Sequence, residues 1–123
     1  MHTAAQIRAE AHASALRVLR SLELPPGTAL AATGSFARNE MTPHSDIDVI
    51  LIYPEGHEPD PTLVEQLWYP VWDAKYRLDY ALRTPQECGA IAAEDASAGF
   101  AQLDLAFVAG RKVLVDEARA QLL

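Results

Sequence analysis

Two aspartates separated by one residue, at the head of an apolar run, constrain this chain more than any other feature. The stretch reads DIDVILIY over residues 46–53. Apolar and β-branched residues in a run of this length predict a strand, whose side chains alternate between two faces. Asp46 and Asp48 therefore share a face with Ile50 and Ile52. Because both faces are apolar beyond Asp48, we expect a central strand whose two aspartates lie where the sheet meets solvent.

The paired aspartates also predict a cation. Two residues along a strand, the carboxylates of Asp46 and Asp48 stand roughly 6.5 Å apart. Carboxylates this close raise one another's pKa values unless a cation lies between them. Mg²⁺ suits the position because it takes oxygen ligands and keeps coordination sites open for phosphate oxygens. The stretch therefore predicts a site for a metal-bound nucleotide, with Asp46 and Asp48 as metal ligands.

Composition limits the class of protein. With 123 residues, half of them hydrophobic, the chain has the length and composition of one globular domain. Its net charge of −7 argues against a nucleic-acid partner. No apolar run reaches the length of a membrane span, so we expect no membrane partner. A single cysteine, Cys88, fits a reducing cytoplasm, which is the expected location.

The remaining pattern predicts an α/β domain with a small sheet flanked by helices. Apolar spacing and turn signals place the other elements as follows. We expect helices over residues 3–22 and 62–74, a break near Tyr69 caused by Pro70, strands over 28–33 and 76–83, a helix that starts at the Thr84–Glu87 capping box, one or two helices as far as Val108, and a last helix within 111–123.

Residues around these strands supply further candidates. Gly34 and Ser35 follow the strand at 28–33, where small residues let a phosphate approach the backbone. Arg38 could reach the same phosphates, although a solvated arginine is nearly as good an interpretation. Asp79, in the strand at 76–83, is a candidate third carboxylate and metal ligand. It could equally be a surface residue paired with Arg77 or Arg83.

The spacing of these motifs resembles the nucleotidyltransferase superfamily that includes DNA polymerase β. Gly34-Ser35, ten further residues and then Asp46-Ile47-Asp48 match its signature, which implies the nucleotidyltransferase fold. Three longer segments are similar to the N-terminal domain of the PII uridylyltransferase family. They read PHSDIDVILIYPEG, LWYPVWDAKYRLDYALRTPQEC and EDASAGFAQLDLAFVAG. At residues 79–80 the chain has Asp-Tyr where that family more often has Gly-His.

The resemblance implies an enzyme. Its reaction is Mg²⁺-dependent transfer of UMP from UTP, or AMP from ATP, to a hydroxyl of a protein acceptor, the PII nitrogen-signalling protein. Asp46, Asp48 and Asp79 would be catalytic, and Gly34, Ser35 and Arg38 would bind the nucleotide. We expect residues 1–123 to be one nucleotidyltransferase domain without the HD and ACT domains of full-length family members.

Two other functions remain open from the sequence. The first is a minimal stand-alone nucleotidyltransferase of the antitoxin type, which would modify a toxin partner. The second is a regulatory domain that binds nucleotide without turnover. The segments around residues 68–74 and 78–84 favour the PII-modifying enzyme over the first alternative. The presence of both Asp46 and Asp48 argues against the second.

Overall fold

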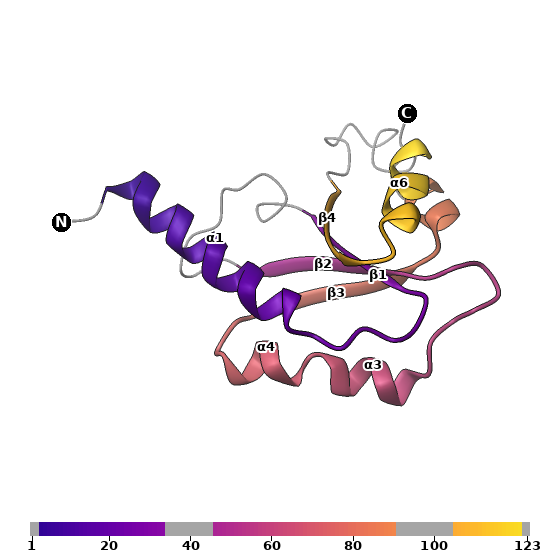
Figure 1. The fold of residues 1–123 in the computed structure, drawn as a ribbon, viewed down its shortest axis with the longest axis horizontal. Helices are drawn as coiled ribbons and strands as arrows, with labels where there is room; N and C mark the ends of the chain where they lie inside the picture. Colours follow the sequence, from indigo (N-terminus) through magenta and orange to yellow (C-terminus); the bar gives the residue numbers. More distant parts are fainter. Residues whose placement is uncertain (1–2, 34–45, 91–104, 122–123) are drawn as a thin grey trace.

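The structure is a computed structural model, and it describes residues 3–33, 46–90 and 105–121. Gly34, Ser35 and Arg38, three of the predicted site residues, lie outside these ranges. Figure 1 shows the described elements in chain order. They are α1 (Ala4–Arg20), β1 (Ala29–Ala32), β2 (Ile47–Ile52), α3 (Pro61–Leu67), α4 (Tyr69–Asp73), β3 (Leu78–Arg83), β4 (Ala106–Gly110) and α6 (Lys112–Ala120). Residues 85–90 are also helical.

The four strands form one mixed sheet in the order β3-β2-β1-β4. β1 is antiparallel to both β2 and β4, whereas β2 and β3 are parallel. A parallel pair needs a long crossover, and here α3 and α4 provide it. The predicted α/β class, with a small mixed sheet flanked by helices, is confirmed.

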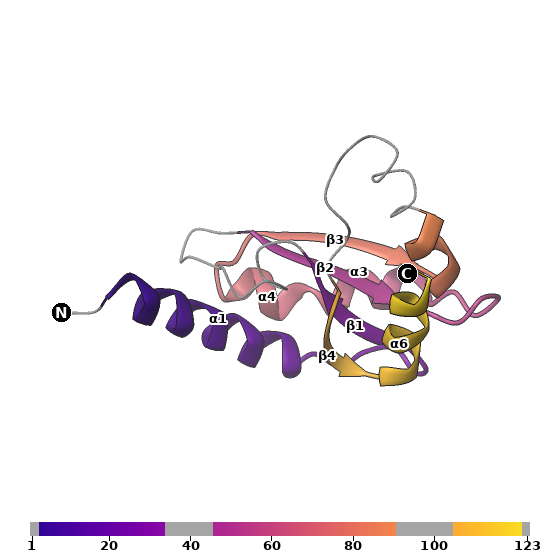
Figure 2. The ribbon, with the colours of Figure 1, turned by 90° about the horizontal axis from the view of Figure 1, so that it is seen from above.

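β2 is a central strand with a hydrophobic core on each face, as its sequence predicts. Ile47, Val49 and Leu51 pack with residues of α1, α3 and α4 on one face. Ile50 and Ile52 pack on the other face with residues of α6 and with Cys88. In Figures 1 and 2 these helices lie on opposite sides of the sheet. Each face of β2 beyond Asp48 is therefore buried.

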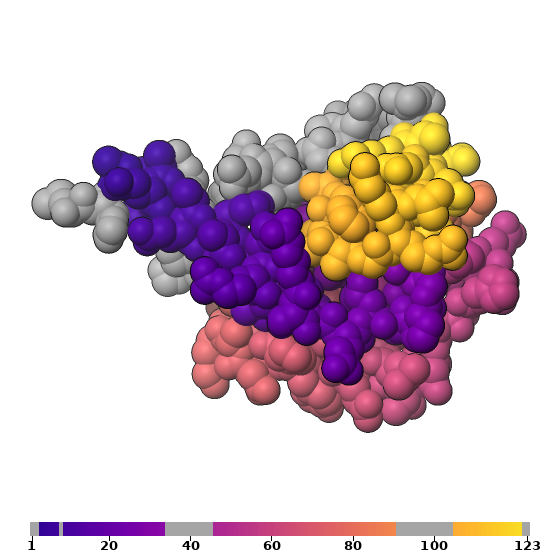
Figure 3. All heavy atoms as spheres, viewed as in Figure 1, coloured from indigo at the N-terminus to yellow at the C-terminus, as the bar shows by residue number. Residues whose placement is uncertain are grey.

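The helices begin and end at local signals. Thr3 caps α1 through a reciprocal capping box with Gln6, and α1 ends two residues before the predicted boundary. The predicted helix over 62–74 is two helices, α3 and α4, which meet at Trp68. Pro70 explains the break, because its ring lacks the N–H that a continuous helix would use. Figure 3 shows the first part of α1 projecting beyond the body of the molecule.

The prediction of helix as far as Val108 is wrong at its end. Residues 106–110 form strand β4, which pairs with β1. Val108 faces the core beneath α1, whereas Phe107 packs on the opposite face, and this alternation is that of a strand. A short apolar run does not distinguish a buried strand from a helix by periodicity, so the partner strand decides. None of the described helices is long and apolar enough to cross a membrane.

Candidate active site

Asp48 and Asp79 lie directly opposite one another on the two parallel strands. Asp48 is the second residue of β2 and Asp79 the second of β3, and the register pairs their Cα atoms. Neighbouring strands are about 4.8 Å apart, and paired residues of parallel strands point to the same face. The register thus places the two carboxylates side by side at the start of both strands, which sequence alternation alone could not establish.

Backbone hydrogen bonds fix this register. The N–H of Ile47 donates to the carbonyl oxygen of Arg77 at 2.9 Å, which aligns the start of β2 with the start of β3. On the other side, the N–H of Thr33 donates to the carbonyl oxygen of Asp48, also at 2.9 Å. The end of β1 therefore meets the starts of β2 and β3. Gly34 and Ser35 follow Thr33 directly in the sequence.

A hollow of about 230 Å³ lies over these strands. Its chemistry changes along its length, from carboxylates at one end, through small and apolar side chains, to a guanidinium. The lining residues are Thr33, Asp48, Val49, Ile50, Asp79, Tyr80, Ala81 and Arg83. Sequence analysis did not select Thr33 or Arg83 as part of a site. The signals were present, because Thr33 precedes Gly34 and Arg83 shares the face of Asp79 by alternation.

The electrostatics of the hollow are unfavourable for a bare carboxylate. Partial burial raises the pKa of Asp48, and the nearby charges of Asp79 and then Asp46 raise it further. Asp46 lies just before β2 and is exposed. Its effect on Asp48 shows that all three carboxylates act on the same region. A cation among them would favour the ionised form of Asp48.

The alternative partners of Asp79 were Arg77 and Arg83. Nη1 of Arg83 donates to the carbonyl oxygen of Leu82 at 2.8 Å, so this donor is used by the backbone. Asp79 itself is exposed. It lies opposite Asp48, and its role as a third carboxylate of the site stays a prediction.

The donor set suits Mg²⁺, which needs only one or two carboxylates when waters and substrate phosphates complete its shell. Asp48 and Asp79 provide hard oxygen donors side by side, and the pKa of Asp48 is raised first by its partial burial and then by the negative charges of Asp79 and Asp46. Across the described ranges, no group of three or more His, Cys, Asp or Glu side chains could together hold a metal ion. The fit is therefore to an open, two-carboxylate site and not to a closed protein cage.

The helical spacing of Trp68 and Trp72, and the place of Cys88 just after a helix start, predict core positions for all three residues. Trp68 is completely buried, and its ring lies 4.8 Å from that of Tyr80 between centroids. Trp72, in contrast, is 41% exposed, so the core prediction is wrong for this residue. Its ring packs edge-on against Tyr69 at the surface. Cys88 is fully buried, and burial raises its pKa to about 11, which confirms it as an apolar core residue.

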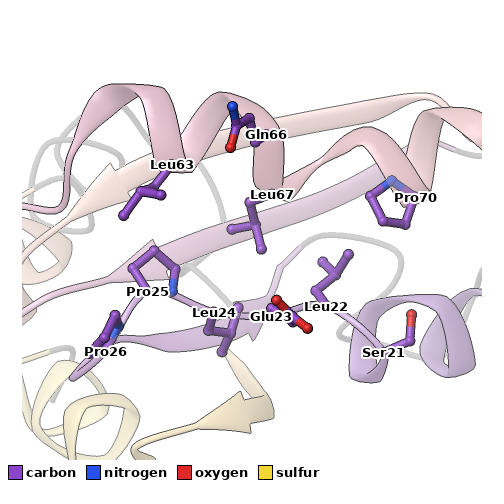
Figure 4. Close-up of a pocket in the computed structure, with 10 residues that line it drawn as sticks. All are labelled: Ser21, Leu22, Glu23, Leu24, Pro25, Pro26, Leu63, Gln66, Leu67 and Pro70. Carbon is purple, nitrogen blue, oxygen red and sulfur yellow. The ribbon is translucent and has the colours of Figure 1, made fainter.

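A larger groove of about 460 Å³ lies away from the carboxylates. It separates the connection after α1 from α3 and α4, and Figure 4 shows mainly leucine and proline side chains along it. Glu23 is the one charged residue of its lining. This groove is larger than the hollow over β2 and β3, but the paired carboxylates favour the hollow as the candidate active site.

Comparison with known proteins identifies the family of the domain. Residues 14–99, more than half of the chain, match the model of the nucleotidyltransferase domain. The chain belongs to the nucleotidyltransferase domain family. The match includes β1, β2 and β3, and therefore every described residue of the hollow.

Several similar proteins are bacterial enzymes of one name. The chain is 54% identical, over 99% of its length, to the bifunctional uridylyltransferase/uridylyl-removing enzyme of Corynebacterium glutamicum. Enzymes of the same name from Mycobacterium tuberculosis and Streptomyces coelicolor are 37% and 35% identical over 77% and 79% of the chain. The chain spans only 17% of the first relative's length and 12% of each of the other two.

A solved structure is also similar. A candidate nucleotidyltransferase from Sulfolobus solfataricus aligns over 85% of this chain and 88% of its own, with 16% sequence identity and a TM-score of 0.49. The family assignment itself rests on the sequence matches.

Proposed function

We propose that this nucleotidyltransferase domain transfers UMP from UTP, or AMP from ATP, to a hydroxyl of a protein acceptor. The observation that carries the proposal is the pairing of Asp48 with Asp79 at the start of two parallel strands. The 54% identity to an enzyme named as a uridylyltransferase supports UTP as the donor. We propose the PII nitrogen-signalling protein as acceptor and the cytoplasm as location, which the buried single cysteine fits.

In this proposal Asp48 and Asp79 hold Mg²⁺ bound to the triphosphate, and the exposed Asp46, predicted as a third ligand, adds only its negative charge nearby. The ion, when bound, offsets the negative charge that develops on the α-phosphate and on the leaving pyrophosphate. Asp48 is half-buried and fixed within β2, so it positions the nucleotide. Gly34 and Ser35 would contribute a backbone N–H and a hydroxyl to phosphate oxygens, and Arg38 a guanidinium.

Asp79 is the proposed general base. It lies on an edge strand of the sheet and is exposed, whereas Asp48 lies on the central strand. A protein hydroxyl that approaches from solvent therefore meets Asp79 first. The hydroxyl proton passes to the Asp79 carboxylate as its oxygen attacks the α-phosphorus, and the bond to pyrophosphate breaks. The products are a nucleotidylated hydroxyl and pyrophosphate.

The test is transfer of labelled UMP or AMP to a purified PII protein in the presence of Mg²⁺. We expect Asp48→Asn and Asp79→Asn each to lower transfer at least a hundredfold, in the usual range for lost acid–base and charge stabilisation. Asp73→Asn is the matched control, because Asp73 is exposed on α4 at the other face of the sheet. Transfer that survives Asp48→Asn would refute the metal role. Metal-dependent nucleotide binding without transfer to any acceptor would favour the regulatory alternative.

A further inference from the structure

Arg83 is a charged residue of the hollow for which the phosphate chemistry provides no role. It shares a sheet face with Asp79 and Ala81, and it lines the same hollow as both carboxylates. Among the described lining residues it is the one cation. The hydrogen bond from its Nη1 to the carbonyl oxygen of Leu82 holds the guanidinium in place, and the guanidinium has further N–H donors.

Spacing along β3 separates Arg83 from the phosphate end of the hollow. Four residues of strand place the Cα atoms of Asp79 and Arg83 about 13 Å apart. Ala81 and Ile50 form a pair between them, and the half-buried Ala81 supplies most of the accessible apolar surface there, because Ile50 is only 7% exposed. An apolar surface does not stabilise a bound polyphosphate, whereas it stabilises the flat ring of a bound nucleobase. The order carboxylate, apolar pair, guanidinium follows the order of phosphate, ring and outer ring edge in a nucleotide.

We infer that Arg83 is the residue that recognises the nucleobase, and that it selects uracil. This inference rests on the proposed nucleotidyl transfer and specifies its donor. A guanidinium donates hydrogen bonds and cannot accept them. Uracil presents a carbonyl oxygen at its 4 position, which accepts such a bond. Cytosine has an amino group at its 4 position, which donates. Opposite the guanidinium, both the amino group and the guanidinium N–H would then lack an acceptor. UTP should therefore bind better than CTP although the two rings have the same size.

The experiment measures the affinity of the 123-residue chain for UTP, CTP and inorganic tripolyphosphate, each with Mg²⁺, by calorimetry. Wild type should bind UTP about tenfold or more better than CTP, as expected for one charge-assisted hydrogen bond. Arg83→Gln should bring the UTP:CTP ratio close to one and leave tripolyphosphate binding unchanged. Arg83→Lys keeps the charge without the planar fork, and it should restore the ratio only in part.

Two further variants separate the possible causes. Arg17→Gln removes the same charge from an exposed position on α1, which packs on the opposite face of the sheet, and should change no ratio. Ala81→Leu fills the space over the apolar pair, so it should weaken UTP and CTP alike and spare tripolyphosphate. Ala81→Leu therefore tests whether the base lies over Ala81, even if Arg83→Gln lowers the stability of the chain.

Three results would overturn the inference. An equal loss of all three ligands in Arg83→Gln would make Arg83 a phosphate ligand. An unchanged UTP:CTP ratio with a lower unfolding temperature would limit Arg83 to holding the Leu82 carbonyl. If wild type binds none of the three ligands, the proposed function fails as well, which separates that failure from the first two results.

Discussion

At the scale of single residues, the carboxylate of Asp48 lowers the stability of the fold at neutral pH, although the proposed function needs it. Its carboxylate is half-buried and close to two other negative charges, and these conditions raise its pKa. A raised pKa in the folded state means that the folded chain holds this proton more tightly than the unfolded chain does. Stability from this group is therefore complete below the unfolded pKa and is lost as the pH rises through the folded value. Such costs are typical of functional sites.

Asp48→Asn should remove this dependence. In urea unfolding measured from about pH 4 to pH 7, the variant should gain stability relative to wild type as the pH rises, because only wild type must ionise a buried carboxylate. At acid pH the two should be nearly equal. Asp73→Asn, on the exposed surface of α4, controls for the loss of one negative charge. A variant that becomes less stable than wild type toward neutral pH would contradict the assigned electrostatics.

At the scale of elements, the pairing of β2 with β3 creates the site. Alternation in residues 46–53 and 76–83 correctly predicted both strands and the faces of Asp48 and Asp79. It could not predict the register, because alternation within each strand is compatible with every pairing that differs by two residues. The bond from Ile47 to Arg77 sets that register in the folded chain. A shift of two residues would keep both faces correct but would place Asp48 opposite Ala81, leaving the carboxylates unpaired.

β4 shows where local reasoning fails. Helix was predicted as far as Val108, yet residues 106–110 form an edge strand against β1. β1 consists of small residues, Ala29, Ala31 and Ala32 with Leu30, and its backbone accepts partners on both sides. The partner strand is about 75 residues away in sequence, so a local sequence pattern cannot predict the pairing of β4 with β1.

The junction between β4 and α6 depends on Gly110. Its φ of 88° favours glycine, and a Cβ there would overlap the carbonyl oxygen of Thr28 and lie 2.9 Å from the Cα of Ala29. Gly27 has a similar φ of 79° but open space around it. Gly27→Ala should therefore cost about 1 kcal/mol for backbone strain alone. Gly110→Ala should cost about 3 kcal/mol, because overlap adds to strain.

Chemical unfolding of both glycine variants measures this difference. The comparison is informative because the backbone conformations match and only the surroundings differ. Equal losses of stability would show that the close approach of β4 to β1 at this point contributes nothing.

At the scale of the whole molecule, a hydrophobic groove and a smaller hollow with charged ends lie on different parts of the domain. The paired carboxylates make the small hollow the candidate site. The chain covers about a sixth of its Corynebacterium glutamicum relative, so nucleotide binding is the property of this domain that can be tested most directly. Sequence reasoning predicted the family and two strand-borne aspartates, whereas the fold supplied their partnership and added Arg83.

The central claim is that Asp48 and Asp79 act together to hold a metal-bound nucleotide. A double-mutant cycle of Asp48→Asn and Asp79→Asn on the affinity for UTP with Mg²⁺ tests it most directly. Each single change should weaken binding at least about tenfold, and the double change should add little, giving a coupling of about 1 kcal/mol or more. Affinity that is unchanged by Asp79→Asn, or losses that add within about 0.5 kcal/mol, would contradict a shared site.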